Sequence, residues 1–157
     1  MTSPSPEEFR NAMALVPTPV TVVTAPGEAE PAGATANAVA SLSLDPPLML
    51  VCLDHRSRTL GVVRSAGKFA INVLPAASEE QARVFATTAP HAEKWQGVAA
   101  TERSGVPVLD DAIVWVVCEL RDLLEGGDHT IVTGHVLELG TSEGDPLLFM
   151  DGEYRTL

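Results

Sequence analysis

The chain has 157 residues, a formal net charge of −11 and a sequence pI near 4.6. Because nucleic-acid binding needs a basic face that can meet phosphates, this charge excludes nucleic acid as the main partner. No apolar run approaches the ~20 residues of a membrane span. The first residues also lack the basic start and apolar stretch of a secretory signal, so we expect a cytoplasmic protein with no membrane partner.

The length fits one domain, 1–157, since the composition shows no break and no linker. Within it we expect residues 1–8 to be flexible. Cys52 and Cys118 both lie inside apolar runs, where a buried, reduced thiol is the usual state. The sequence therefore predicts a core without a disulfide.

The first predicted element is a short helix. Ser5 and Glu8 form a capping-box pattern around Pro6, a residue that fits the first helical position, and the helix must end before Pro17. We expect this helix to lie as a lid on the sheet. The β-branched run Val20–Thr24 then predicts the first strand.

The segment Gly33–Leu44 alternates strictly, which predicts one strand. One face carries Ala34, Ala36, Ala38, Ala40, Leu42 and Leu44, and the other carries Thr35, Asn37, Ser41 and Ser43. Small polar side chains, with alanine where bulk is usual, would let a flat ligand approach the backbone N–H and C=O groups, as a flavin ring requires. The alternative to a ligand site is an ordinary antiparallel strand whose polar face is exposed to solvent.

Further elements follow in order. A turn at Asp45–Pro47 leads to an apolar strand, and a short helix closed by Gly67 precedes the next strand. Ser78 and Gln81 suggest a second capping box. The predicted strands are Leu48–Leu53, 68–74, 112–125, 129–140 and 146–150, with an irregular region and one helical turn at 86–105.

This pattern gives six or seven strands, two or three short helices and no regular βα alternation. It favours an antiparallel barrel over a doubly wound sheet. The chain contains no GxGxxG, P-loop, CxxC or HExxH motif, so any dinucleotide binds without a Rossmann turn.

Two chemical motifs are rejected. Residues 140–144 match G-x-S-x-G, but Asp145 and Pro146 follow where a helix is needed, and no histidine lies beyond Ser142. His129 and His135 would be separated by about 20 Å along one strand, too far to share an ion, and no metal site is expected.

His129 opens a strand directly after a Gly-Gly-Asp turn. A titratable ring there can project into a cleft, with Asp128 beside it to influence its protonation. The alternative is a turn histidine that bonds only to the backbone.

Five segments in the same order resemble the short-chain flavin reductase family, the reductase components of two-component flavin monooxygenases. These segments are GATANAVASLSLDPPLMLVCLDHRSRT, GKFAINVL, EKWQGV, GDHTIVTGHV and PLLFMDGEYRTL. The similarity runs from about Phe9 to Leu157.

The resemblance implies a mainly β fold, an antiparallel split β-barrel of the Greek-key, FMN-binding kind with a few short flanking helices. It also implies a homodimer that binds FMN or FAD, reduces it with hydride from NADH or NADPH, and supplies the reduced flavin to a separate flavin-dependent monooxygenase component. The alternative function is a non-catalytic flavin- or haem-binding protein on the same barrel.

The resemblance also places the site. His129 would act near the nicotinamide, as the catalytic-site residue. The cofactor-binding residues it implies are Thr35, Ala36, Asn37, Ala38, Ser41, Leu42, Ser43, Asp54, Ser57, Arg58, Thr59, Lys94, Trp95, His129, Tyr154 and Arg155. The Asp54–Thr59 turn would face a phosphate. Ala38 stands where many members have serine, and Asp151 stands where a basic residue is common.

Overall fold

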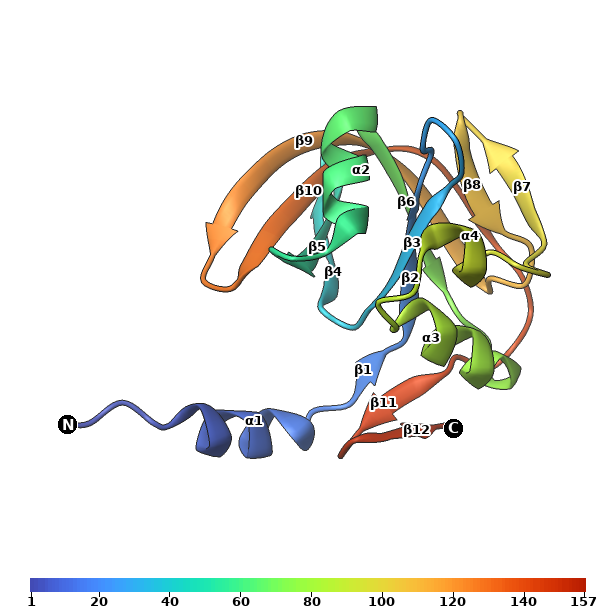
Figure 1. Ribbon diagram of the computed structural model, residues 1–157. Coiled ribbons are helices and arrows are strands. Elements are labelled where there is room, and N and C mark those ends of the chain that lie inside the picture. The colour runs from blue at the N-terminus through green and yellow to red at the C-terminus, as the bar shows by residue number, and fades with distance from the viewer.

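The computed structural model describes residues 1–157 and arranges their strands in three antiparallel sheets (Figure 1). The largest sheet has seven strands in the order β3-β2-β6-β9-β10-β5-β4. Its members are β2 (Thr21–Ala25), β3 (Ala32–Ala36), β4 (Val39–Leu44), β5 (Pro47–Asp54), β6 (Lys68–Val73), β9 (Val114–Gly126) and β10 (His129–Thr141). The small sheets contain β1 (Thr18–Pro19), β11 (Leu148–Met150) and β12 (Glu153–Arg155), and β7 (Ala100–Arg103) with β8 (Val106–Leu109).

The large sheet is curled, because its two edge strands are consecutive in the chain. Only Asn37 and Ala38 connect the end of β3 to the start of β4. In a flat sheet these edges would lie about 29 Å apart, at ~4.8 Å per neighbouring pair, whereas the connection can span only about 11 Å. The sheet therefore bends until its edges approach without pairing. This confirms the expected mainly β, split-barrel architecture.

The single strand expected over Gly33–Leu44 is wrong. The chain leaves β3 at Ala36, where it pairs with β2, and enters β4 at Val39, where it pairs with β5 on the opposite edge. The two halves of the alternating segment thus belong to different edges of the sheet. Alternation continues across the break because each half has one inner face, so the pattern alone does not show the crossing.

The core fills the inside of the curl. Val23, Phe69, Ile71 and Val132 are almost completely buried there, together with Cys118. Both cysteines are free thiols, as predicted. The helix α2 (Arg58–Ala66) covers this core with its apolar side. It ends, as predicted, at Gly67, whose φ of 68° is the left-handed conformation that glycine adopts most readily.

The N-terminal helix α1 (Pro6–Ala14) has the predicted capping box. The Glu8 N–H donates to Ser5 Oγ over 3.2 Å, and the Ser5 N–H donates to Glu8 Oε2 over 2.7 Å. The helix buries none of its residues and projects from the body, so the expectation that it is a lid is wrong (Figure 1). Residues 6–8, expected to be flexible, form its first turn.

The remaining helices lie on one side of the curl. A 3-10 turn, η1 (Ala76–Ser78), leads into α3 (Glu79–Phe85), and α4 (His91–Lys94) is the helical turn expected within 86–105. The second capping box is wrong, because the Ser78 hydroxyl accepts no hydrogen bond from the backbone at the start of α3 and instead donates to Asp111. No helix combines the length and the apolar character needed to cross a membrane.

The strands missed by sequence reasoning are β1, β7, β8 and β12, each of two to four residues. Strands of this length are too short for alternation to be recognised. Residues 140–144 lead into β11 without a helix, as the rejection of the serine-hydrolase motif requires, and β10 and β11 belong to different sheets.

Candidate functional site

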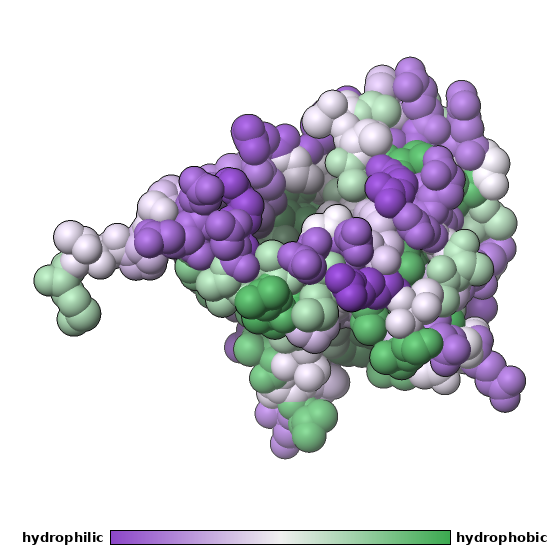
Figure 2. Space-filling view, turned by 90° about the horizontal axis from the view of Figure 1, so that it is seen from below, coloured by the Kyte–Doolittle hydropathy of each residue, from purple (hydrophilic) through white to green (hydrophobic).

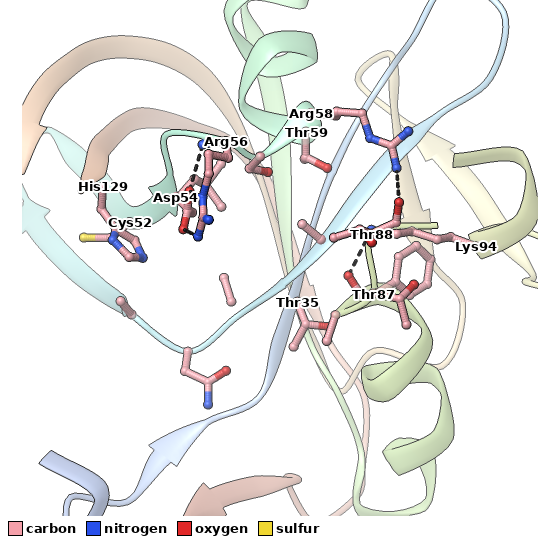
Figure 3. A pocket seen from close by; sticks show the side chains of 18 of the residues that line it. Thr35, Cys52, Asp54, Arg56, Arg58, Thr59, Thr87, Thr88, Lys94 and His129 are labelled. Atoms are coloured by element: carbon pink, nitrogen blue, oxygen red, sulfur yellow. Dashed lines mark hydrogen bonds and ion pairs between the residues drawn. The ribbon is translucent and has the colours of Figure 1, made fainter. Parts of the chain in front are cut away.

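A cavity of about 750 Å³ opens at the split between the two edges of the barrel. Its walls come from segments that are far apart in the sequence and that meet because the sheet curls. The lining residues are Ala34–Ala38, Cys52–Asp54, 56–59, 85–88, His91, Lys94 and His129. Figure 3 shows His129, Cys52, Asp54 and Arg56 on one side of the cavity and Arg58, Thr88 and Lys94 on the other.

His129 reaches the cavity because of the hairpin that joins the two longest strands. Gly127, with φ of 75°, and Asp128 form the two-residue turn between β9 and β10, so His129 becomes the first residue of β10. Its Nδ1 lies 2.7 Å from Asp128 Oδ1, and this hydrogen bond lowers the pKa of the Asp128 carboxyl. The ring is therefore held by its neighbour at the cavity mouth, with 41% of the side chain exposed.

Asp54 faces His129 across the pairing of β10 with β5. Arg56 donates to it through both the backbone and the guanidinium, with Nη2 3.0 Å from Oδ2, and these bonds hold the pKa of the Asp54 carboxyl well below its usual range. Cys52 lies two residues earlier on β5, hence on the same face, and it lines the cavity together with His129 (Figure 3). Burial raises the pKa of the Cys52 thiol.

The opposite end carries cations that hold a loop in place. Lys94 is 6% exposed, and its Nζ donates to the carbonyls of Gly33, over 3.3 Å, and Phe85, over 3.2 Å. Burial, followed by the charge of Arg58, lowers the pKa of Lys94. Arg58, at the start of α2, donates to the carbonyls of Thr88, over 2.6 Å, and Ala89.

The wall between these ends is made of small residues. Ala34, Ala36 and Ala38 line it. The Thr35 hydroxyl is already used, because it donates to the Ala82 carbonyl of α3 over 2.7 Å, and the Asn37 amide donates to Thr18 Oγ1 over 3.0 Å. A flat group at this wall would therefore meet mostly backbone and methyl groups.

Ten of the residues expected at the site do line the cavity. They are Thr35, Ala36, Asn37, Ala38, Asp54, Ser57, Arg58, Thr59, Lys94 and His129. They come from β3 and its connection to β4, from the turn before α2, from α4 and from the start of β10. The structure thus brings together the parts of the motifs that are separated by up to about a hundred residues in the chain.

Six expected residues are not brought to the cavity of this chain. Ser41, Leu42 and Ser43 lie on β4, beyond the point where the chain has crossed to the other edge. Trp95 packs edge-on against Phe85, with ring centroids 5.3 Å apart, and so supports the wall from behind.

The last two of the six lie on β12 in the small sheet. The Tyr154 ring packs against Phe149, with Arg83 stacked 4.8 Å from its centroid, and Arg155 pairs with Glu153.

Sequence reasoning missed Cys52, Thr87, Thr88 and His91 as lining residues. The apolar run around Cys52 predicts a core residue, although its spacing of two from Asp54 indicates that the two side chains share a face. The other three lie in the irregular region, where no periodicity shows which way a side chain points.

The arrangement can hold a flat polar ring and an anionic tail. Small side chains and backbone groups form the wall, cations stand at one end, and an imidazole oriented by a carboxylate stands at the other. The backbone groups of the wall can bond to the polar edge of a ring, and the cations can bind a phosphate through charge. The imidazole can contact a second ring.

Comparison with known proteins agrees with this geometry. The chain is 39% identical over 147 residues to the reductase component of 4-nitrophenol 4-monooxygenase/4-nitrocatechol 2-monooxygenase of Rhodococcus opacus, covering 94% of this chain and 78% of that one. It is 39% identical over 163 residues to the NADH-dependent FMN reductase AsuE2 of Streptomyces nodosus subsp. asukaensis, covering 99% and 87%. It is 40% identical over 153 residues to a probable flavin reductase of Rhizobium meliloti (strain 1021), covering 96% of this chain and about half, 49%, of that one.

The fold is shared as well. The solved structure of flavin reductase PheA2 in its native state superposes with a TM-score of 0.90 at 34% identity, covering 98% of this chain and 99% of that one. Residues 13–157 match the family model described as flavin reductase like domain. The chain therefore belongs to the flavin reductase like family.

Proposed function

We propose that this protein is an NAD(P)H:flavin oxidoreductase that reduces FMN or FAD by hydride transfer and releases the reduced flavin to a separate monooxygenase. The observation that carries the proposal is the cavity at the barrel split, which joins a small-residue wall, a cationic end and His129 in one space. Its volume of about 750 Å³ lies within the usual range of ligand sites, ~300–1,000 Å³.

The wall from Ala34 to Ala38 would hold the flavin ring. Alanine side chains let a planar group come close to the main chain, whose N–H and C=O groups can then bond to the polar edge of the ring. Bound flavin supplies the hydride acceptor, and the protein supplies orientation and electrostatics.

His129 would orient the nicotinamide. Its Nδ1 is engaged by Asp128, which leaves Nε2 to bond to the incoming nucleotide. Hydride transfer between two cofactors needs close stacking rather than a nucleophile, so the protein's contribution is position. We do not assign His129 as an obligatory acid.

Among nicotinamide nucleotides we propose NADH. AsuE2, one of the relatives above, is named as NADH-dependent and as an FMN reductase, which supports the same choice for this chain.

We also propose a homodimer. Phe9 and Met13 on α1 are 59% and 48% exposed, and Leu42 and Leu44 on β4 are 48% and 94% exposed. Figure 2 shows hydrophobic residues open to solvent among hydrophilic ones on the face seen from below. A second copy would cover such residues and would place Ser41, Leu42 and Ser43 at an interface. A monomer mass by light scattering at micromolar concentration would contradict this.

The function is tested by mixing the protein with FMN and NADH in the absence of oxygen. A reductase consumes NADH as the flavin loses its colour. A non-catalytic flavin-binding protein would bind the flavin and leave NADH unchanged, and a protein that also fails to bind flavin would refute the site itself.

A further inference from the structure

One end of the cavity gathers three side chains that can carry positive charge: Arg58 on α2 and His91 and Lys94 on α4. We call them the cationic end. None of the three forms an ion pair with a carboxylate in the structure. In a chain of net charge −11, with 21 acidic and 10 basic residues, such unpaired cations facing one cavity are unusual.

The surroundings of Lys94 are the clearest sign that this end of the cavity lacks a negative counter-charge. It is more than nine-tenths buried, and its Nζ has only the carbonyls of Gly33 and Phe85 as partners. An ammonium group has three donors, so one proton is left without an acceptor. Burying a charge without a counter-charge is costly, and an anion in the cavity would remove that cost.

His91 is the second independent sign. His91 is one of the residues that line the cavity, yet both of its ring nitrogens are buried and neither has a hydrogen-bond partner. Buried polar atoms are nearly always bonded, so a doubly unpaired imidazole calls for an explanation. A ligand that enters the cavity can supply the partner once the ring turns about its side-chain bonds.

The charges around His91 come from three elements. Lys94 on the same helix and Arg58 on α2 face it as cations, and Glu30 in the loop between β2 and β3 is the acidic group that acts on it. Burial, then Lys94, then Arg58 lower the pKa of His91, and Glu30 opposes them. These surroundings favour the neutral form of the imidazole, and a nearby anion would favour its protonated form.

We propose that His91 is a phosphate-binding residue, which joins Lys94 and Arg58 in receiving the phosphate of a bound nucleotide and takes up one proton from solvent as the anion enters. The inference rests on the proposed function, because it assigns a subsite within the same cavity. It extends the phosphate end from the Asp54–Thr59 turn, where the sequence motif places it, across to α4.

The phosphate could come from the flavin or from the nicotinamide nucleotide, and two sets of measurements distinguish them. The first compares FMN with riboflavin, which has no phosphate, by fluorescence titration and by calorimetry in two buffers of different ionisation enthalpy near neutral pH. The variant is His91→Gln, which keeps hydrogen-bonding ability and cannot titrate. The control is His135→Gln, an exposed histidine of β10 that does not line the cavity.

If the flavin supplies the phosphate, His91→Gln weakens FMN binding by about tenfold, the loss expected for one charge-assisted hydrogen bond. Riboflavin binding stays unchanged, and the extra proton uptake that FMN shows over riboflavin in the wild type disappears. His135→Gln behaves as the wild type in all of these measurements.

If the nicotinamide nucleotide supplies the phosphate, the FMN to riboflavin ratio is unaffected by His91→Gln. Instead the KM for NADH, measured with riboflavin as the acceptor, rises by a similar factor. Either pattern supports His91 as a phosphate ligand and identifies the source.

The inference is overturned if His91→Gln changes neither the FMN to riboflavin ratio nor the KM for NADH. Should that variant not fold, the wild type decides: equal proton uptake with FMN and with riboflavin, and none with NADH, overturns it. A protein that binds no flavin at all would instead refute the proposed function, so the two failures are distinguishable.

Discussion

His129 and Asp54 stand opposite each other where β10 pairs with β5, and a neighbour holds each of them. Asp128 binds the His129 ring at 2.7 Å, and Arg56 binds the Asp54 carboxylate at 3.0 Å. Two short-range pairs thus fix the mouth of the cavity from two different strands. A ring held in this way can position a second ring.

Replacement of His129 by alanine should raise the KM for NADH or slow hydride transfer, with little change in the affinity for oxidised flavin. The reason is that His129 lies at the mouth, away from the wall of small residues that would hold the flavin. Steady-state kinetics and flavin titration of His129→Ala, beside His135→Ala as the control, measure both quantities. Loss of flavin binding in His129→Ala would refute the role assigned to it.

Replacement of Gly33 by alanine should distort the cavity wall. A Cβ at Gly33 would lie 2.5 Å from Cε1 of Phe85, a ring that is 1% exposed and cannot move freely. We expect a loss of about 1–3 kcal/mol in the free energy of unfolding, as for other overpacked cores, together with weaker flavin binding. Urea unfolding and flavin titration measure the two effects.

Gly61 is the matched control for this substitution. It lies within α2, and a Cβ there would meet nothing within 4 Å. Gly61→Ala should therefore stabilise the protein by about 0.5–1 kcal/mol. If both alanine variants lose the same stability, close packing at Gly33 is not the cause.

Lowering the pH should reduce the stability of the folded protein as Asp54 becomes protonated. Arg56 lowers the pKa of Asp54 from its ordinary value of 3.8, so the ionised carboxylate favours the folded state. That contribution is fully present above the ordinary value and is lost as the pH falls below it. Asp54→Asn should show a smaller fall in Tm between about pH 5 and about pH 3 than the wild type. Because Arg56 is exposed, we expect a difference of a few degrees at most. Parallel curves for the two proteins would contradict the assignment.

The two thiols should differ sharply in reactivity. Cys52 lines the cavity, whereas Cys118 is fully buried, and burial raises the pKa of the Cys118 thiol to about 12. A thiol reagent at neutral pH should modify only Cys52 in the folded protein, and FMN bound in the same cavity should slow that reaction by hindering the reagent's approach to the thiol. Cys52→Ser identifies the site. An unchanged labelling rate with saturating FMN would place the flavin elsewhere.

The sequence predicts the ends of helices and strands well where a few neighbouring residues determine them. Gly67 ends α2 because a left-handed residue is needed there, and the Gly127–Asp128 turn determines that His129 opens β10. Ser5 and Glu8 form their capping box because both partners lie within one helical turn. In each case the interacting residues are near neighbours in the chain.

The sequence predictions are wrong where contacts with distant segments determine the local structure. Nothing within Gly33–Leu44 reveals that Ala36 pairs toward β2 while Val39 pairs toward β5, because register depends on the partner strand. Ser78 bonds to Asp111, far away in the sequence, in place of the start of its own helix. His91 lies in a segment without periodicity, so only the folded chain shows that it lines the cavity.

The central claim, that the cavity brings flavin and nicotinamide together for hydride transfer, is tested most directly by an oxygen-free titration of the protein and FMN with NADH. The account predicts that NADH absorbance falls in step with the bleaching of the flavin, at a rate proportional to protein concentration and much reduced in His129→Ala. A protein that binds FMN but leaves both absorbances unchanged would contradict it.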